Sequence, residues 1–110
     1  MTKNIEGILP IVATPFTPAG AVDMPSFEKL CHTLALNGCH GLTLFGIAGE
    51  YYKLTDPERE EMAGRMIPIC REHGVLSVVS VTDHAAEVAV QRARQWQSLG
   101  ADVLMLLPPF

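Results

Sequence analysis

Four short apolar runs alternate with segments of helical character, and this alternation limits the folds that the chain can adopt. The runs cover residues 7–13, 41–45, 75–81 and 103–107. The first is nearly continuous and rich in branched side chains, as is typical of strands buried on both faces of a parallel sheet. Strands that alternate with helices lie parallel and are joined by right-handed crossovers. The sequence therefore predicts an α/β fold with the order βαβαβαβ.

The three segments between these runs carry start and stop signals of helices. Asp23 is placed to cap the first, and Thr55 with Glu58 has the spacing of a capping box at the start of the second. A third helix is expected from about residue 85 to 99, with Asp83 as a candidate N-cap. Each helix ends near a glycine, namely Gly38, Gly74 and Gly100.

The chain has 110 residues and stops where the fourth predicted strand meets its loop. That point is about halfway through a TIM (β/α)8 barrel, which usually needs about 250 residues. We therefore expect a TIM barrel, with residues 1–110 as the N-terminal half of one domain that covers the first four strands and three helices. Four strands cannot close a barrel, so two sheet edges and an apolar inner face would lie open. A half-barrel that pairs with a partner is the alternative.

The composition excludes several classes of protein. The chain is 48% hydrophobic and 18% charged, which predicts a sizeable core, and its net charge of −4 without a basic block argues against nucleic-acid binding. The sequence shows no signal peptide and no apolar run of about 18 residues, so no membrane association is predicted. Three cysteines without CxxC spacing are expected to be reduced thiols in a cytoplasmic protein. No zinc-binding motif of cysteines and histidines is recognised, so no metal site is predicted.

A glycine loop follows the second run and ends in an acid, Glu50. Its sequence, Gly46-Ile47-Ala48-Gly49-Glu50, comes just before the second predicted helix. In a barrel, loops at the carboxyl ends of the strands build the active site. Gly46 and Gly49 would allow the backbone to approach a ligand closely, with N–H groups free to hold an anion.

Four motifs in this order resemble the dihydrodipicolinate synthase / N-acetylneuraminate lyase family. They are Ala13-Thr14-Pro15-Phe16, the run from Gly41 to Glu50, Leu54-Thr55-x-x-Glu58-Arg59, and Leu107-Pro108-Pro109-Phe110. The resemblance implies a TIM barrel, usually a homotetramer, in which a lysine amine forms a Schiff base with pyruvate or another 2-oxo acid. It implies no cofactor.

The resemblance also implies roles for individual residues. The loop backbone would grip the substrate carboxylate, and the predicted substrate-binding residues are Thr14, Gly46, Ile47, Ala48, Gly49 and Glu50. Many family members carry hydroxyl residues where this chain has Ile47 and Ala48. A relay tyrosine of the synthases is replaced by Phe110, so the relay position lacks its hydroxyl. These departures argue against dihydrodipicolinate synthase itself and favour a sugar-acid aldolase or dehydratase.

Several assignments stay open at this point. The family's lysine lies on the sixth strand, outside this chain, and Lys53 has no sequence signal of a depressed pKa. Thr14 would donate to the site or serve the turn before Pro15, and Glu50 would contact substrate or brace its loop. Asp83-His84 would act as acid and base or begin the third helix.

Three functions follow as hypotheses. The leading one is a Schiff-base-forming lyase, inactive as the 110-residue chain alone. The second is a non-catalytic half-barrel that binds a 2-oxo acid or pairs with another subunit. The third is a doubly wound nucleotide-binding domain, which the lack of a GxGxxG motif after the first strand disfavours. The sequence leaves the exact substrate and the direction of the reaction open.

Overall fold

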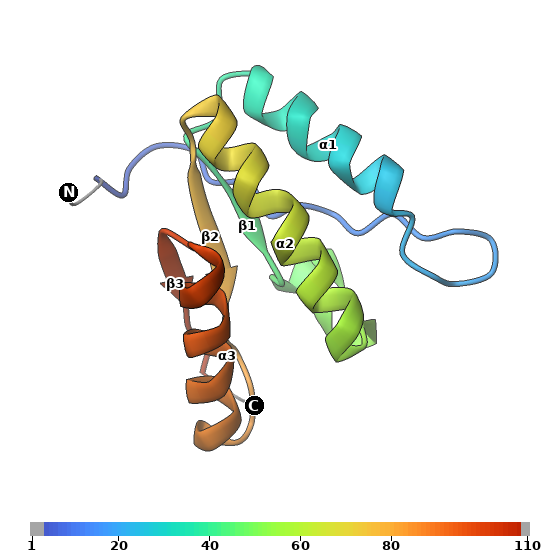
Figure 1. The fold of residues 1–110 in the computed structure, drawn as a ribbon, viewed down its shortest axis with the longest axis vertical. Helices are drawn as coiled ribbons and strands as arrows, with labels where there is room; N and C mark the ends of the chain where they lie inside the picture. Colours follow the sequence, from blue (N-terminus) through green and yellow to red (C-terminus); the bar gives the residue numbers. More distant parts are fainter. Residues whose placement is uncertain (1–3, 109–110) are drawn as a thin grey trace.

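The computed structural model describes residues 4–108 as three helices against a parallel sheet (Figure 1). The helices are α1 (Met24–Leu36), α2 (Asp56–His73) and α3 (Ala86–Leu99). The strands are β1 (Gly41–Leu44), β2 (Leu76–Ser80) and β3 (Val103–Met105), and two short 3₁₀ turns, η1 (Ile47–Gly49) and η2 (Tyr51–Lys53), follow β1.

The three strands lie side by side in the order in which they occur along the chain. β1 pairs with β2 and β2 pairs with β3, each in parallel, with Gly41 opposite Leu76 and Val78 opposite Val103. A doubly wound sheet reverses its strand order at a switch point, and this sheet does not. Right-handed crossovers in one direction place successive helices on the same face. The arrangement is that of a barrel wall, which confirms the predicted α/β fold class.

The first predicted strand, residues 7–13, is present only as an isolated parallel bridge between Ile11 and Thr43. The segment still follows β1, since Val12 donates to the Thr43 carbonyl at 2.9 Å and Thr43 donates to the Pro10 carbonyl at 2.9 Å. Proline has no N–H, so Pro10 cannot continue a regular ladder. The prediction of a complete strand buried on both faces is wrong, because Ile8 and Ile11 remain 67% and 41% exposed.

The helix starts follow their caps in two cases of three. Asp23 accepts from the Ser26 N–H, and Thr55 and Glu58 form both bonds of the predicted capping box. The predicted N-cap role of Asp83 is wrong. Helix α3 begins one residue after Ala85, which caps it without a side-chain bond, and Asp83 instead accepts from the Ala85 N–H at 3.1 Å.

The core lies between the helices and one face of the sheet. Its fully buried side chains include Phe27 and Cys31 of α1, Met66 of α2 and Trp96 of α3. Burial and the neighbouring Cys70 raise the pKa of the Cys31 thiol to about 12, so this thiol is a neutral packing group.

None of the helices in residues 4–108 is both long and apolar enough to cross a membrane.

Candidate active site

The carboxyl ends of β1 and β2 meet at one edge of the sheet, and the Gly46–Glu50 loop leaves from it (Figure 1). Two non-glycine residues that bound this loop, Phe45 and Glu50, have φ angles of 65° and 56°. Such left-handed conformations are costly for residues with side chains and persist where surrounding contacts impose them. Phe45 is buried against Trp96, with ring centroids 5.5 Å apart. Packing from α3 therefore fixes the point at which the loop begins.

Both loop glycines pack closely against Ile11 and Val12, which lie beside β1. A Cβ on Gly49 would lie 2.9 Å from the Val12 carbonyl oxygen, and one on Gly46 would lie 2.7 Å from the Ile11 side chain. Neither separation is compatible with an unshifted side-chain carbon. The sequence signal of two glycines thus has a steric cause in this fold.

Thr14 holds the loop from the same side. Its hydroxyl donates to the Gly49 carbonyl at 2.6 Å, across 35 positions of sequence. The hydroxyl proton is therefore used within the protein, which makes Thr14 a residue that positions the loop. Its predicted contact with substrate stays a prediction.

Replacing Thr14 with valine should lower the free energy of unfolding by about 1 kcal/mol, because the Gly49 carbonyl loses its donor. The same change should raise KM for the 2-oxo acid that the family resemblance implies, since the loop is no longer fixed. Urea denaturation and steady-state kinetics measure the two effects. Thr14→Ser retains the hydroxyl and serves as the control. Equal KM values for the valine variant and the parent would contradict a positioning role.

Ile47 and Ala48 form the exposed top of the loop between the buried Gly46 and Gly49. Within the described residues, neither backbone N–H donates a hydrogen bond to the protein. The next two N–H groups, of Gly49 and Glu50, bond to carbonyls of the same turn at 3.0 Å. The loop therefore presents two adjacent unused donors at the carboxyl edge of the sheet, which is a geometry suited to an anion.

Glu50 and Lys53 form an ion pair on the outer side of the loop. The Lys53 Nζ lies 2.7 Å from a Glu50 carboxylate oxygen, and both side chains are largely exposed. Hydrogen bonding to Glu50 raises the pKa of Lys53. A nucleophilic amine needs the opposite shift, so Lys53 is unsuited to imine formation. Glu50 pairs with this lysine, and its predicted contact with substrate stays untested.

A cavity of about 280 Å³ opens between the loops that follow β1 and β2. Its lining comes from both loops and from α2, and comprises Ile47, Tyr51, Tyr52, Arg59, Thr82, Asp83 and His84. Arg59 is the cation of this lining, with one guanidinium N–H donated to the Tyr51 carbonyl at 2.8 Å. Its Nε is buried and has no hydrogen-bond partner among residues 4–108. Burial first, and then nearby Arg92, lower the pKa of Arg59. An anionic ligand beside the guanidinium would offset the cost of keeping this buried group charged.

A second cavity of about 200 Å³ adjoins the first, since Ile47 and Thr82 line both. Its other walls are mostly apolar and come from Ile11, Phe45, Gly46, Ser80, Met105, Leu106 and Leu107. The hydroxyls of Ser80 and Thr82 lie 2.8 Å apart, and Thr82 also accepts from the Leu107 N–H at 3.0 Å. The two hydroxyls connect the ends of β2 and β3 beneath the glycine loop.

The pair Asp83-His84 lies at the first cavity, but Asp83 is engaged elsewhere. A hydrogen bond from the Ala85 N–H and the nearby Arg92 guanidinium hold the pKa of Asp83 below its ordinary value. Arg92 lies 3.5 Å from Asp83 and 3.2 Å from Asp56, which links α3 to the start of α2. A carboxylate held ionised in this way is a structural anion, which disfavours the acid–base interpretation of Asp83.

The sequence therefore predicts the glycine loop correctly, but it does not identify the neighbouring polar side chains of Arg59, Ser80 and Thr82. The sequence motifs include Arg59 only as the end of the Leu54–Arg59 motif, and they predict no role for the buried hydroxyls of Ser80 and Thr82. Their positions in the sequence could have identified them, because Arg59 lies near the start of α2, Ser80 ends β2 and Thr82 follows it, all at the carboxyl edge of the sheet. Phe110, the predicted relay position without a hydroxyl, lies outside the described residues.

Comparison with known proteins places this site in context. The chain is 30% identical to an L-2-keto-3-deoxyarabonate dehydratase of Azospirillum brasilense over 99% of its own length and 35% of the relative's. It is 28% identical to a 4-hydroxy-tetrahydrodipicolinate synthase of Stenotrophomonas maltophilia over 97% of its length and 36% of that protein's. It thus spans about a third of the curated relatives that it matches.

Solved structures give the same result. The crystal structure of a dihydrodipicolinate synthase from Rhodopseudomonas palustris superimposes with a TM-score of 0.89 and 32% identity, over 99% of this chain and 36% of that one. The model of the dihydrodipicolinate synthetase family matches residues 4–110. This chain therefore belongs to the dihydrodipicolinate synthetase family.

Proposed function

We propose that the protein is a Schiff-base-forming lyase acting on pyruvate or a related 2-oxo acid, and that its nucleophilic lysine lies outside these 110 residues. The observation that carries the proposal is the pair of unused N–H groups on Ile47 and Ala48, held at the carboxyl edge of the sheet by Thr14 and by tightly packed glycines. Residues 1–110 are then the N-terminal half of one TIM-barrel domain.

The chemistry explains why such a loop is needed. A 2-oxo acid carries a carboxylate next to its reactive carbonyl, so two backbone donors on the carboxylate fix the direction of that carbonyl. A lysine amine adds to the carbonyl carbon, and water leaves as the protonated imine forms. The imine then accepts the electron pair released by aldol cleavage or by loss of a proton before dehydration. The role of this chain is to bind and orient the acid.

The lysines of the described chain support a nucleophile elsewhere. Lys29 is exposed on α1, away from the carboxyl edge, and Lys53 is exposed and paired with Glu50. The Lys53 amine is exposed and paired with a carboxylate, whereas desolvation or a neighbouring cation is what lowers a lysine pKa. The whole protein would need a lysine on a later strand that faces the Gly46–Glu50 loop.

The two cavities support a sugar-acid substrate. Ile47 and Ala48 offer no side-chain hydroxyl to a proton relay, which disfavours dihydrodipicolinate synthesis. Arg59 lines the first cavity, and its guanidinium could hold the hydroxyls or a second acidic group of a longer substrate. An L-2-keto-3-deoxyarabonate dehydratase is among the relatives of this chain, at 30% identity. We assign a 2-keto-3-deoxy sugar acid as the substrate class. We also propose that the whole protein is a cytoplasmic homotetramer.

Assays on the protein at its natural length test the reaction class. Purified protein is incubated with 2-keto-3-deoxy sugar acids, and the products are followed by NMR. Dehydration gives loss of water without cleavage, whereas aldol cleavage releases pyruvate. We expect one of these products, and we expect turnover of a sugar acid to exceed condensation of pyruvate with an aldehyde. The absence of turnover in every assay would favour the non-catalytic alternative.

A further inference from the structure

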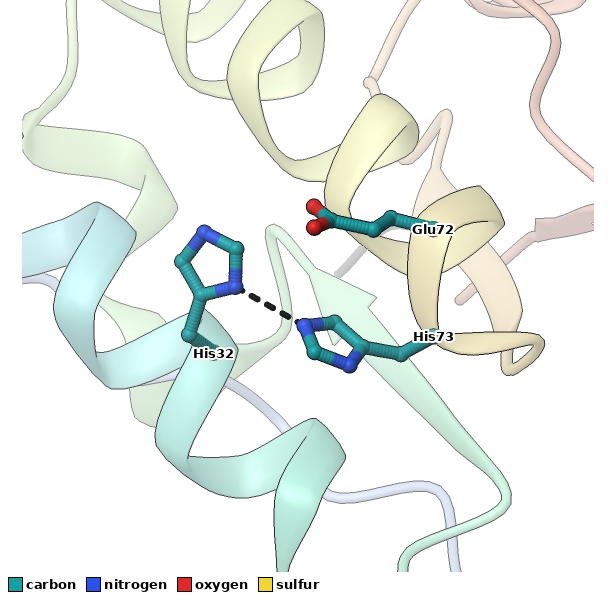
Figure 2. A group of neighbouring side chains, drawn as sticks. All are labelled: His32, Glu72 and His73. Carbon is teal, nitrogen blue, oxygen red and sulfur yellow. Dashed lines mark hydrogen bonds between the residues drawn. The ribbon is translucent and has the colours of Figure 1, made fainter.

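A cluster of two histidines and one glutamate lies between α1 and α2, outside the site described above (Figure 2). His32 comes from α1, whereas Glu72 and His73 are the last two residues of α2. Since α2 runs back from the carboxyl edge of the sheet, its end lies on the opposite face of the fold from the glycine loop. The cluster is thus remote from the proposed reaction.

The geometry of the cluster is close to that of a metal site. His32 Nδ1 and His73 Nε2 are 2.9 Å apart, and a Glu72 carboxylate oxygen lies within 4.8 Å of a ring nitrogen of each histidine. Two imidazole nitrogens bound to one tetrahedral zinc ion, at about 2.0–2.1 Å each, stand roughly 3.4 Å apart. A separation of the two rings by about half an ångström would therefore admit the ion.

The burial of the three side chains fits the same function. Both imidazoles are half-buried, whereas Glu72 is exposed. Figure 2 shows the Glu72 side chain extending from the end of α2 alongside His73 toward His32. Within residues 4–108 no hydrogen bond or ion pair is made by the Glu72 carboxylate, which leaves it available as a ligand. The end of α2 also carries the negative pole of the helix dipole, which favours a cation there.

We propose that His32, Glu72 and His73 bind a divalent first-row transition metal ion, with Zn²⁺ as the representative case. Two imidazoles and one carboxylate suit such ions, whereas Mg²⁺ and Ca²⁺ prefer oxygen ligands alone. Water completes the coordination. The ion links α1 to α2 across 41 positions of sequence and replaces the single hydrogen bond between the two rings. It is a structural ion that takes no part in the chemistry at the glycine loop.

The test measures zinc affinity in the protein at its natural length, freed of metal, by competition with a chromophoric chelator. We expect one zinc equivalent that is lost or weakened at least about tenfold in His32→Gln and in His73→Gln, since even the loss of a residue that only supports a ligand costs that much. Glu72→Gln should also bind more weakly. Residue 72 is exposed, so we expect the Glu72→Gln variant to fold. Zinc, but not Mg²⁺, should raise the Tm of the parent protein.

His84→Gln serves as the matched control, because it removes one histidine from an exposed loop and leaves α1 and α2 unchanged. Its zinc affinity should equal that of the parent. Parent and Glu72→Gln proteins that bind zinc equally well, or histidine variants that match the His84→Gln control, would overturn the proposal. Since the measurement involves no substrate, it fails or succeeds independently of the proposed lyase activity.

Discussion

Replacing Gly49 with alanine is expected to lower kcat/KM for the 2-oxo acid substrate by about 100-fold. The new Cβ would lie 2.9 Å from the Val12 carbonyl oxygen, which belongs to backbone and cannot rotate away. Val12 is itself held to β1 by its bond to Thr43, so the loop must move instead. A displacement of about 1 Å at a group that orients substrate is sufficient for a loss of this size. Steady-state kinetics on the protein at its natural length measure it.

Gly64 provides the matched control for this substitution. It lies exposed in α2, and a Cβ there would meet no atom within 4 Å. Gly64→Ala should therefore leave kcat/KM unchanged and stabilise the fold by about 0.5–1 kcal/mol, because alanine is the better helix former. Equal losses of activity in both variants, or full activity in Gly49→Ala, would show that the packing of the loop does not govern the reaction.

Replacing Trp96 with alanine is expected to reduce the free energy of unfolding by about 3–5 kcal/mol, the usual cost of deleting a buried aromatic side chain. Trp96 is 0% exposed and donates its indole N–H to the Ser80 carbonyl at 3.1 Å. It also packs on Phe45, which holds a left-handed conformation at the start of the glycine loop. The substitution should therefore damage both stability and the site. Urea denaturation followed by circular dichroism gives the magnitude.

Trp96→Phe separates the two contributions of this residue. Phenylalanine retains most of the packing on Phe45 and loses the donor to Ser80, so the expected cost is about 1–3 kcal/mol for a buried acceptor without a partner. An alanine variant no less stable than the phenylalanine variant would contradict the view that ring packing dominates. Because a folded protein has a margin of only about 5–15 kcal/mol, the milder variant also ensures a measurable transition.

The features that the sequence predicted correctly depend on neighbours along the chain. The capping box of Thr55 and Glu58 spans one helical turn, and Gly74, which ends α2, comes directly after the last residue of that helix. The glycine loop was identified for a similar reason, since two glycines after an apolar run leave little choice of structure. Local chemistry of this kind is decided within a few residues, so it survives folding unchanged.

The features that the sequence missed depend on residues that are far apart. The bond between Thr14 and Gly49 spans 35 positions, and the contact between His32 and His73 spans 41. Periodicity also favoured a full first strand, whereas Pro10 removes a donor from the ladder. Asp83 illustrates a competition between local options, because an acid before a helix can bond to several nearby N–H groups. Here Asp83 accepts from the Ala85 N–H, and Arg92 of α3 lies 3.5 Å from its carboxylate.

Trapping of the imine tests the central claim most directly. The protein at its natural length is incubated with pyruvate and borohydride, which adds hydride to the imine carbon and leaves a stable secondary amine on the lysine. Peptide mass measurement then locates the adduct. We predict one adduct, on a lysine outside residues 1–110. Less of this adduct should form in Gly49→Ala, and none should form on the 110-residue chain alone. The absence of an adduct on the whole protein, or an adduct on Lys53, would contradict the account.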